Sequence, residues 1–233
     1  MTHNYRSLII IKIEWREVFI YTDNERVVEA YVGEYASGKS EMAINRALEL
    51  SSQGRRVTLV DLDTVEPFYT LRPLKEFLEG LGLNLISFST EDAFGLGETG
   101  AMLNPRARWA LYNEGDIILD IGYGVYGAQA LNLVEGASES KELQILAVIN
   151  STRPMTNSQE RIAEYLQELG HVDAIIANTH LGDETTLEII MEGNEEIIAV
   201  AKRLNIPVAF IAAEEKFAAQ LIELNTDIPV KFI

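Results

Sequence analysis

The sequence predicts an α/β fold in which the strands of a mostly parallel sheet alternate with helices. From about residue 27 onward, short apolar stretches rich in Val, Ile and Leu alternate with longer stretches whose apolar residues recur at helical spacing. This alternation is typical of βαβ units, which place parallel strands side by side and cover them with helices. A chain of 233 residues with 47% hydrophobic content can bury one full core. We therefore expect a single domain over residues 1–233.

The expected elements follow the chain in order. Residues 8–13 and 18–21 are typical of short strands, and we expect residues 1–26 to form a β extension at an edge of the sheet. The later expected strands are 27–32, 55–60, 84–88, 116–120, 143–149, 172–177 and 208–212. The expected helices are 41–50, 71–81, 105–112, 157–169, 184–204 and 214–224.

The turn between strand 27–32 and helix 41–50 carries the clearest chemical signal. It fits the pattern G-x-x-x-x-G-K-[ST] at every fixed position. Its residues are Gly33, Glu34, Tyr35, Ala36, Ser37, Gly38, Lys39 and Ser40. Glycines let successive backbone N–H groups face one centre, where they hold phosphate oxygens. A chance match in an ordinary turn is the alternative, but the strand before this turn and the helix after it favour a nucleotide site.

The polar groups of this turn have expected roles in binding a nucleotide. Lys39 supplies a positive charge for the phosphates, and Ser40 offers a hydroxyl ligand to a Mg²⁺ that bridges the β- and γ-phosphates. The helix around Glu41 points the positive end of its dipole at the anion. We therefore expect phosphate contacts from Gly33 to Glu41 and Mg²⁺ at Ser40.

Polar side chains also stand where several strands end. In open parallel sheets, ligands bind beyond the carboxyl ends of the strands. Asp61 and Asp63 can therefore approach the γ-phosphate, its Mg²⁺ or the attacking water, although Asp61 is equally suited to capping the next turn. Asp120 ends strand 116–120 and is expected to hold Mg²⁺ through water. Asn178 follows a late strand, where its amide can contact a purine edge or serve only in a turn.

The composition excludes several classes of partner. Nineteen Lys and Arg against 36 Asp and Glu give a net charge of −17, which repels nucleic acid and anionic membranes. Because the chain has no cysteine, it forms no disulfide and no thiolate-held iron–sulfur cluster. The sequence shows no signal peptide and no apolar run of transmembrane length, so we expect a cytoplasmic location.

Together these motifs resemble the ParA/MinD and nitrogenase iron-protein branch of the P-loop NTPases, a SIMIBI-like group. The resemblance rests on the phosphate loop, Asp61-Leu62-Asp63, Asp120-Ile121-Gly122 and Asn178, and it spans roughly residues 27–212. Within the branch, the chain is most similar to a bacterial and archaeal group of ATP-binding proteins. The resemblance implies a three-layer sandwich with a mostly parallel sheet of seven to eight strands, Mg²⁺ and ATP as ligands, and often an ATP-dependent homodimer.

The same resemblance implies roles for individual residues. Lys39 and Ser40 would bind phosphate and Mg²⁺. Asp63 would position or activate the attacking water, Asp120 would contact the metal shell, and Asn178 would read adenine.

One position departs from this branch. The branch usually has a lysine directly after the first loop glycine, where it reaches the partner's nucleotide across a dimer, but this chain has Glu34. A negative charge cannot neutralise phosphate, so Glu34 argues against a face-to-face ATP sandwich. The guanine-reading pattern Asn-Lys-x-Asp is also missing, since Thr179 and His180 follow Asn178. ATP is therefore favoured over GTP.

We expect an ATPase that acts as a conformational switch on a protein partner. The loops at 61–67 and 122–127 would order around the γ-phosphate and relax after its loss. One alternative is a small-molecule kinase or ligase that holds its substrate at the glycine-rich loop 94–100 and at Arg106 or Arg108. That loop is equally suited to being a plain connector. Another alternative is a sensor that binds ATP without hydrolysing it.

Overall fold

The computed structural model describes residues 25–64, 71–88, 103–223 and 228–233. The strands expected at 8–13 and 18–21, and with them most of the N-terminal β extension, lie outside these ranges. The glycine-rich loop 94–100 lies outside them as well.

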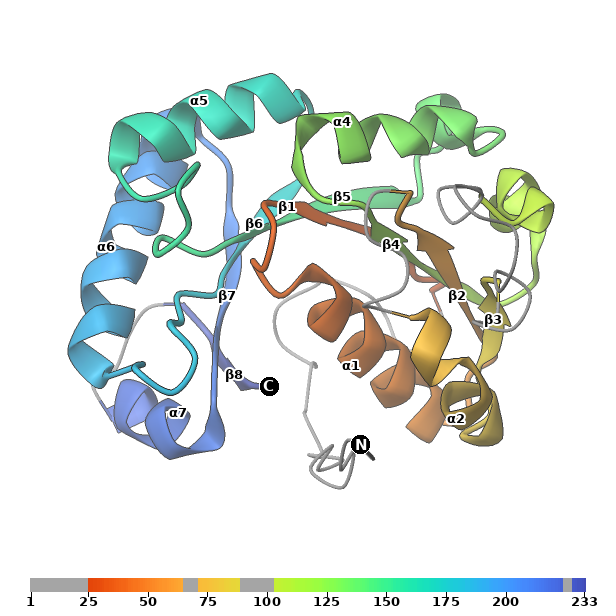
Figure 1. Cartoon of the computed structure of the whole chain (residues 1–233), viewed down its shortest axis with the longest axis horizontal. Coiled ribbons are helices and arrows are strands. Elements are labelled where there is room, and N and C mark those ends of the chain that lie inside the picture. Colours follow the sequence, from red (N-terminus) through yellow and green to blue (C-terminus); the bar gives the residue numbers. More distant parts are fainter. Residues whose placement is uncertain (1–24, 65–70, 89–102, 224–227) are drawn as a thin grey trace.

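Eight parallel strands form one sheet within the described residues, in the order β3-β2-β4-β1-β5-β6-β7-β8 (Figure 1). The strands are β1 Val28–Gly33, β2 Val57–Leu62, β3 Asn84–Ile86, β4 Asp116–Ile121, β5 Leu143–Ile149, β6 Ala174–Ala177, β7 Val208–Ala213 and β8 Val230–Phe232. The predicted α/β fold with a parallel sheet of seven to eight strands is confirmed. The sequence pattern missed β8, which is short and pairs only with β7.

Helices cover both faces of this sheet. The α-helices are α1 Lys39–Ser52, α2 Lys75–Gly80, α4 Gly124–Ala128, α5 Gln159–Leu169, α6 Leu187–Leu204 and α7 Glu215–Glu223. Short 3-10 helices are η1 Arg72–Leu74, η3 Pro105–Tyr112, η4 Gln129–Leu133 and η5 Ala137–Glu139. Within the described part of the chain, no helix combines the length and the apolar character that crossing a membrane requires.

The helices and the sheet form three layers with two apolar cores. Helices α1 and α2 pack on one face and α4, α5 and α6 on the other (Figure 1). Alternate residues along β1 point into the two cores: Val28, Ala30 and Val32 belong to one, and Tyr31 belongs to the other together with Val27, which directly precedes the strand. The central strands β1, β2 and β4 are therefore buried along their whole length and are mostly apolar, with a few buried polar residues such as Glu29 and Asp120.

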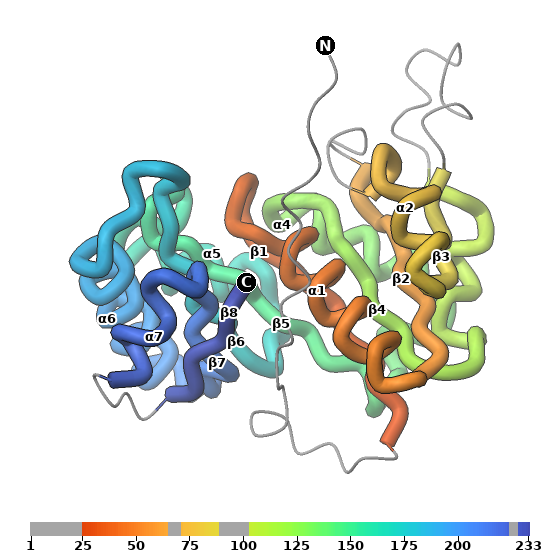
Figure 2. The backbone as a smooth tube through the Cα atoms, turned by 90° about the horizontal axis from the view of Figure 1, so that it is seen from below, coloured from red at the N-terminus to blue at the C-terminus, as the bar shows by residue number. Residues whose placement is uncertain are grey.

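The two ends of the sheet flank a central strand, loop and helix. Figures 1 and 2 both place β2, β3 and α2 at one end and β7, β8, α6 and α7 at the other. Strand β1 and helix α1 lie between them, so the glycine-rich turn that joins β1 to α1 sits near the middle of the molecule (Figure 2). A ligand bound at this turn can therefore contact both halves of the sheet.

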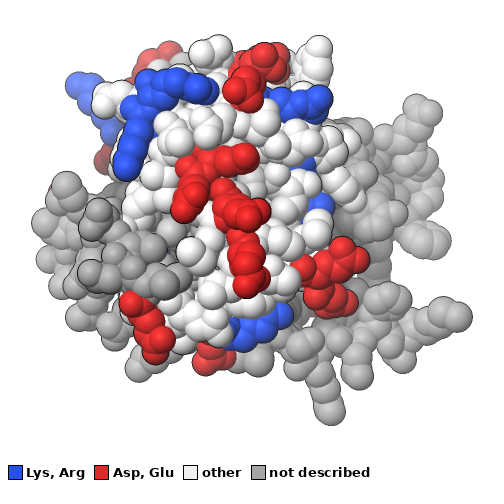
Figure 3. All heavy atoms as spheres, turned by 90° about the vertical axis from the view of Figure 1, so that its left-hand side faces the viewer, with Lys and Arg blue, Asp and Glu red and all other residues white. Residues whose placement is uncertain are grey.

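The outer side of the molecule around α6 is acidic. Figure 3 shows Asp and Glu side chains gathered in a band on this side. Glu188, Glu192 and Glu195 are exposed and stand three or four residues apart along α6, while residues such as Ile190 and Ile197 are buried on its other side. Helix α6 thus turns its charged stripe to solvent and its apolar stripe to the sheet.

Two predicted helices and one predicted loop differ from the structure. Residues 105–112 form a 3-10 helix with a kink at Trp109 rather than an α-helix. The segment expected as one helix at 71–81 is divided into η1 and α2. The loop expected at 122–127 contains the short helix α4, whose first residue Gly124 has a positive φ of 75° that permits the sharp entry.

A buried ion network joins α1 to β1 beneath the turn. Arg46 of α1 contacts Glu29 of β1 at 3.2 Å and Glu49 of its own helix at 2.9 Å. The Tyr31 hydroxyl donates a hydrogen bond to Glu29 at 2.7 Å. The side chains of all three charged residues are no more than 5% exposed, so removing the cation would leave buried carboxylates with less compensation.

Replacing Arg46 with methionine is therefore expected to lower the free energy of unfolding by about 3–5 kcal/mol. Urea denaturation followed by circular dichroism measures this loss. The matched control is Arg56→Met, because Arg56 pairs with Glu114 at the surface and its loss is expected to change stability by less than about 1 kcal/mol. Equal effects of the two substitutions would contradict a structural role for the buried network.

Candidate functional site

The turn after β1 has a conformation that only glycine permits at two positions. A Cβ atom on Gly33 would lie 2.5 Å from the Val148 carbonyl oxygen and 2.6 Å from Ser37 Oγ. Gly38 has φ of 95°, and a Cβ atom there would lie 2.3 Å from Asn178 Nδ2. The Ser37 N–H donates to the Glu34 carbonyl at 3.2 Å. The backbone therefore curls tightly between strand and helix, as a phosphate-binding loop requires.

Lys39 stands at the first position of α1 and is nearly buried. Its Nζ donates to the carbonyl of Glu34 within the same loop, at 3.1 Å. Burial lowers the pKa of the Lys39 ammonium, while the negative charges of Asp120, Asp63 and Glu34 oppose this shift. The ammonium is thus held among acceptors beside the loop, where a phosphate oxygen can replace the carbonyl.

Asp120 is completely buried at the centre of the sheet. On β4 it stands opposite Tyr31 of β1 and Asp61 of β2. Burial raises the pKa of the Asp120 carboxyl to about 7, although Lys39 and the nearby Ser40 hydroxyl lower it. Neither carboxylate oxygen makes a hydrogen bond of ordinary geometry within the described residues. A bound cation would offset the free-energy cost of burying the ionised carboxylate, because a charge in a low-dielectric interior needs a compensating charge.

The Asp61 carboxylate is already engaged by neighbouring groups. It accepts hydrogen bonds from Ser87 Oγ at 2.8 Å and from the Asp63 N–H at 3.0 Å, and Arg72 Nε lies 3.4 Å away. Burial raises the pKa of Asp61, and the bond from Ser87 is the largest of the contacts that lower it. The sequence placed Asp61 beyond the strand, but β2 continues to Leu62. Through its hydrogen bond with the Asp63 N–H, Asp61 holds Asp63 in place directly after the strand.

Arg72 lies beside Asp61 in this site, although no local sequence pattern indicates it. It is 3% exposed, and its guanidinium lies over the ring of Phe88, 5.6 Å from the centroid. Pro73 marked the segment only as the start of a helix, and nothing in the local pattern linked it to Asp61, eleven residues earlier.

Asn178 braces the phosphate loop from the other half of the sheet. Its Nδ2 donates to the carbonyl of Ser37 at 2.8 Å, across 141 residues of sequence. The following segment is fixed as well, because Asn150 Nδ2 and Thr152 Oγ1 both donate to the His180 carbonyl. Asn178 thus positions the phosphate loop and also lines the neighbouring cavity.

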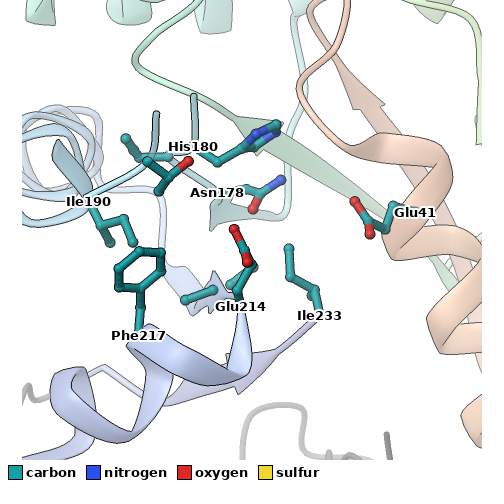
Figure 4. A pocket seen from close by; sticks show the side chains of 11 residues that line it. Glu41, Asn178, His180, Ile190, Glu214, Phe217 and Ile233 are labelled. Atoms are coloured by element: carbon teal, nitrogen blue, oxygen red, sulfur yellow. The ribbon is translucent and has the colours of Figure 1, made fainter. Parts of the chain in front are cut away.

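A cavity of about 200 Å³ lies beside the loop, between α1 and the ends of β6 and β7. The labelled side chains of Figure 4 line it from several elements. They are Glu41, Asn178, His180, Ile190, Glu214, Phe217 and Ile233. The volume is below the roughly 300–1,000 Å³ of a complete small-molecule site, so the cavity suits one end of a ligand whose other end lies on the loop. The sequence pointed to Asn178 here but not to Glu214 or Phe217.

Two further predicted residues lie elsewhere. Arg106 and Arg108 are on η3 and do not line this cavity. Arg108 pairs with Glu135 at 3.0 Å and stacks over Trp109.

Tyr35 of the phosphate loop is about half exposed, and its ring meets that of Tyr123, at the start of α4, edge to face with centroids 5.3 Å apart. This contact links the loop to the segment expected to respond to the γ-phosphate.

Solved structures with a similar fold include proteins of the signal recognition particle system. The cell division protein FtsY of Thermotoga maritima aligns with a TM-score of 0.56 and 22% identity, over 84% of this chain and 64% of that one. The signal recognition particle receptor FtsY of Elizabethkingia anophelis gives 0.58 and 17%, over 87% and 64%. The 54 kDa signal recognition particle protein of Aeropyrum pernix, in complex with GDP, gives 0.54 and 18%, over 84% and 43%.

These likenesses show the fold alone, which is the α/β fold of P-loop NTPases. The chain spans less than two thirds of the length of these structures. No protein-family model matches the chain, and no curated protein matches it. The finer resemblance to the ParA/MinD and nitrogenase iron-protein branch stays a prediction.

The buried Asp120 gives the stability of the protein a defined dependence on pH. Because its pKa in the folded chain, about 7, lies above the ordinary value of 3.8, the folded state holds an extra proton between these values. Stability is therefore lost as pH rises through this window. Asp120→Asn is expected to raise the free energy of unfolding at pH 8 by on the order of 3 kcal/mol, less than the full shift because Lys39 loses its partner. At pH 4 the gain is expected to be near zero.

Urea denaturation of the nucleotide-free, magnesium-free chain at both pH values measures this difference. Asp183→Asn, at an exposed position, is the control and is expected to change stability by less than about 0.5 kcal/mol at either pH. A loss of stability in Asp120→Asn at pH 8 would show that the carboxylate already has a strong partner.

Proposed function

We propose that this chain is a magnesium-dependent ATPase that acts as a nucleotide switch on a protein partner. The observation that carries the proposal is the buried Asp120 carboxylate near Lys39 and Ser40, without ordinary hydrogen bonds among the described residues. A bound cation stabilises such a carboxylate, and a cation beside a loop shaped for phosphate implies a metal-bound polyphosphate. The Aeropyrum pernix protein of similar fold was solved in complex with GDP, which supports a nucleotide as the ligand.

Ser40 and Asp120 are the residues that would hold Mg²⁺. Both offer oxygen, which Mg²⁺ prefers, and this ion usually takes only one or two protein ligands. Within the described ranges, no three His, Cys, Asp or Glu side chains cluster as a complete metal site, so phosphate and water oxygens would supply the other ligands. When bound, the ion would neutralise charge on the β- and γ-phosphate oxygens.

The loop residues Gly33 to Glu41 would hold the phosphates. Backbone N–H groups and the N-terminal end of α1 face the anion, while Lys39 exchanges its bond to the Glu34 carbonyl for one to a phosphate oxygen.

Asp61 is also a metal ligand by the sequence-based expectation. Its contacts with Arg72 and Ser87 suit it better to holding Asp63 in place than to direct coordination.

Asp63 is the residue that would position or deprotonate the attacking water. It follows β2 directly, is 5% exposed, and lies close enough to Lys39 and Asp120 to influence the pKa of each. A carboxylate at this place is suited to orient a water for attack on the terminal phosphate.

The base would occupy the cavity beside Asn178, and we favour ATP as the nucleotide. An asparagine amide pairs with the N6 and N7 atoms of adenine, one donating and the other accepting. The Aeropyrum pernix protein was solved with GDP, a guanine nucleotide. The preference of this chain for adenine or guanine therefore has to be measured.

The switch would operate through the segments that follow β2 and β4. Tyr35 joins the phosphate loop to Tyr123 at the start of α4, so a change at the γ-phosphate can shift α4 and the surface around it. That surface would contact either a protein partner or a second copy of this chain. Because the negative charge of Glu34 would repel the phosphates of a second nucleotide, a partner without a nucleotide opposite this loop is favoured.

Lys39→Ala is expected to weaken binding of Mg·ATP by roughly 10- to 100-fold, because a charged hydrogen bond to phosphate is lost. Isothermal titration calorimetry measures this affinity directly. Lys141→Ala, at an exposed position, is the control and should bind like the unmodified chain. Unchanged affinity in Lys39→Ala would refute the assignment of the loop.

Asp63→Ala is expected to slow phosphate release by roughly 100-fold or more while leaving ATP affinity nearly unchanged. Single-turnover release of phosphate and calorimetric affinity separate the two effects. Equal losses in phosphate release and in ATP affinity would assign Asp63 to binding instead.

The same assay on the unmodified chain separates the alternative functions. Phosphate release that depends on an added metabolite would favour a kinase or ligase, and ATP binding without phosphate release would favour a sensor.

A further inference from the structure

We infer that Glu214 and Asn178 together select a purine with an amino group at position 6, so that this site accepts adenine and rejects guanine and hypoxanthine. The inference rests on the proposed nucleotide site and assigns a role to Glu214, a residue outside the phosphate loop and the metal shell. It follows from the direction of two side chains that line the same cavity.

The orientation of the Asn178 amide is fixed by the phosphate loop. One hydrogen of Nδ2 is used in the bond to the Ser37 carbonyl at 2.8 Å. The amide oxygen Oδ1 therefore points away from the loop, and Figure 4 shows it directed into the cavity, toward Glu214. Asn178 thus presents an acceptor, with its second Nδ2 hydrogen beside it.

Glu214 supplies a second acceptor from the opposite wall. It follows directly after β7, and its carboxylate points up into the cavity toward Asn178 (Figure 4). One oxygen, Oε2, lies 2.9 Å from Nζ of Lys216 in an exposed pair, which leaves Oε1 for a ligand. Such exposed pairs are weak, so Lys216 does not remove the acceptor character of the carboxylate.

The rim of the cavity adds negative charge. Glu41, an exposed residue at the start of α1, faces the same space. Desolvation raises the pKa of its carboxyl, and the negative charge of Glu214 raises it further. No lysine or arginine is among the described residues that line the cavity. The surroundings therefore favour a ligand group that donates hydrogen bonds over one that accepts them.

Adenine meets this arrangement at its exocyclic amine. One N6 hydrogen points to the N7 side of the ring and can bond Asn178 Oδ1, while the free Nδ2 hydrogen bonds N7. The other N6 hydrogen points to the N1 side, where Glu214 accepts it. Guanine and hypoxanthine carry a carbonyl oxygen at position 6, which would face both acceptors with no hydrogen between them. Only the N1 hydrogen, one atom further round the ring, could then pair with Glu214, and Asn178 Oδ1 would stay without a donor.

Calorimetric titration of the chain with the magnesium complexes of ADP, GDP and IDP tests this inference without turnover. We expect ADP to bind roughly 10- to 100-fold more tightly than either 6-oxo nucleotide. In Glu214→Gln the difference should shrink by about 10-fold, because the glutamine amide can turn to donate to O6. Glu215→Gln, at the exposed neighbouring position, is the matched control and should keep the full preference.

Four results would overturn the inference. An undiminished preference in Glu214→Gln would show that Glu214 does not select the base. Tighter binding of GDP than of IDP and ADP, lost in Glu214→Gln, would mean that the carboxylate instead reads the N1 and N2 hydrogens of guanine. Equal binding of all three would show a site without base selection, with the phosphate site intact. If none of them binds, the proposed nucleotide site fails together with the inference.

Discussion

A carboxylate buried at the centre of a parallel sheet, without ordinary hydrogen bonds among the described residues, is the constraint on which this site depends. Asp120 is fully buried, and its raised pKa reflects the free energy that burial costs. Lys39, the cation whose charge acts on Asp120, is itself nearly buried and has a lowered pKa. Two groups that each disfavour their charged forms are thus held side by side. An arrangement of this kind is costly in the free chain, and binding of a metal-bound anion, as proposed above, would offset that cost.

The surroundings of this pair keep it in place. Asp61 ties Asp63 and Arg72 together on one side of Asp120, and Asn178 holds the phosphate loop through Ser37 on the other. These contacts join segments far apart in sequence, so each depends on correct pairing of the parallel strands. A site built in this way is rigid before the ligand arrives, which reduces the ordering that binding requires.

Local patterns predicted the centre of the fold and of the site. The strand, turn and helix around Gly33 to Ser40 are encoded within twenty-five residues, and the strand that ends near Asp120 is recognisable from its apolar run. Position beyond a strand also suffices to nominate Asp63 and Asn178. These features depend on the backbone period and on short-range turn chemistry, which a single sequence records.

Long-range contacts were not predictable in the same way. Arg72 belongs to the site only because η1 folds back onto Asp61, and Glu214 only because β7 ends beside β6. Strand β8 is three residues long and gains its stability from pairing with β7 rather than from its own pattern. The short helix α4 begins at Gly124, which has a positive φ. Glycines in this segment are equally compatible with a loop, so the sequence alone does not predict the helix.

A crystal structure of this chain with magnesium and a non-hydrolysable ATP analogue tests the central claim most directly. We expect β- and γ-phosphate oxygens among the backbone N–H groups of Gly33 to Ser40, with the metal between Ser40 and the Asp120 carboxylate. A nucleotide bound elsewhere, or a metal that leaves Asp120 without a cation, would contradict it.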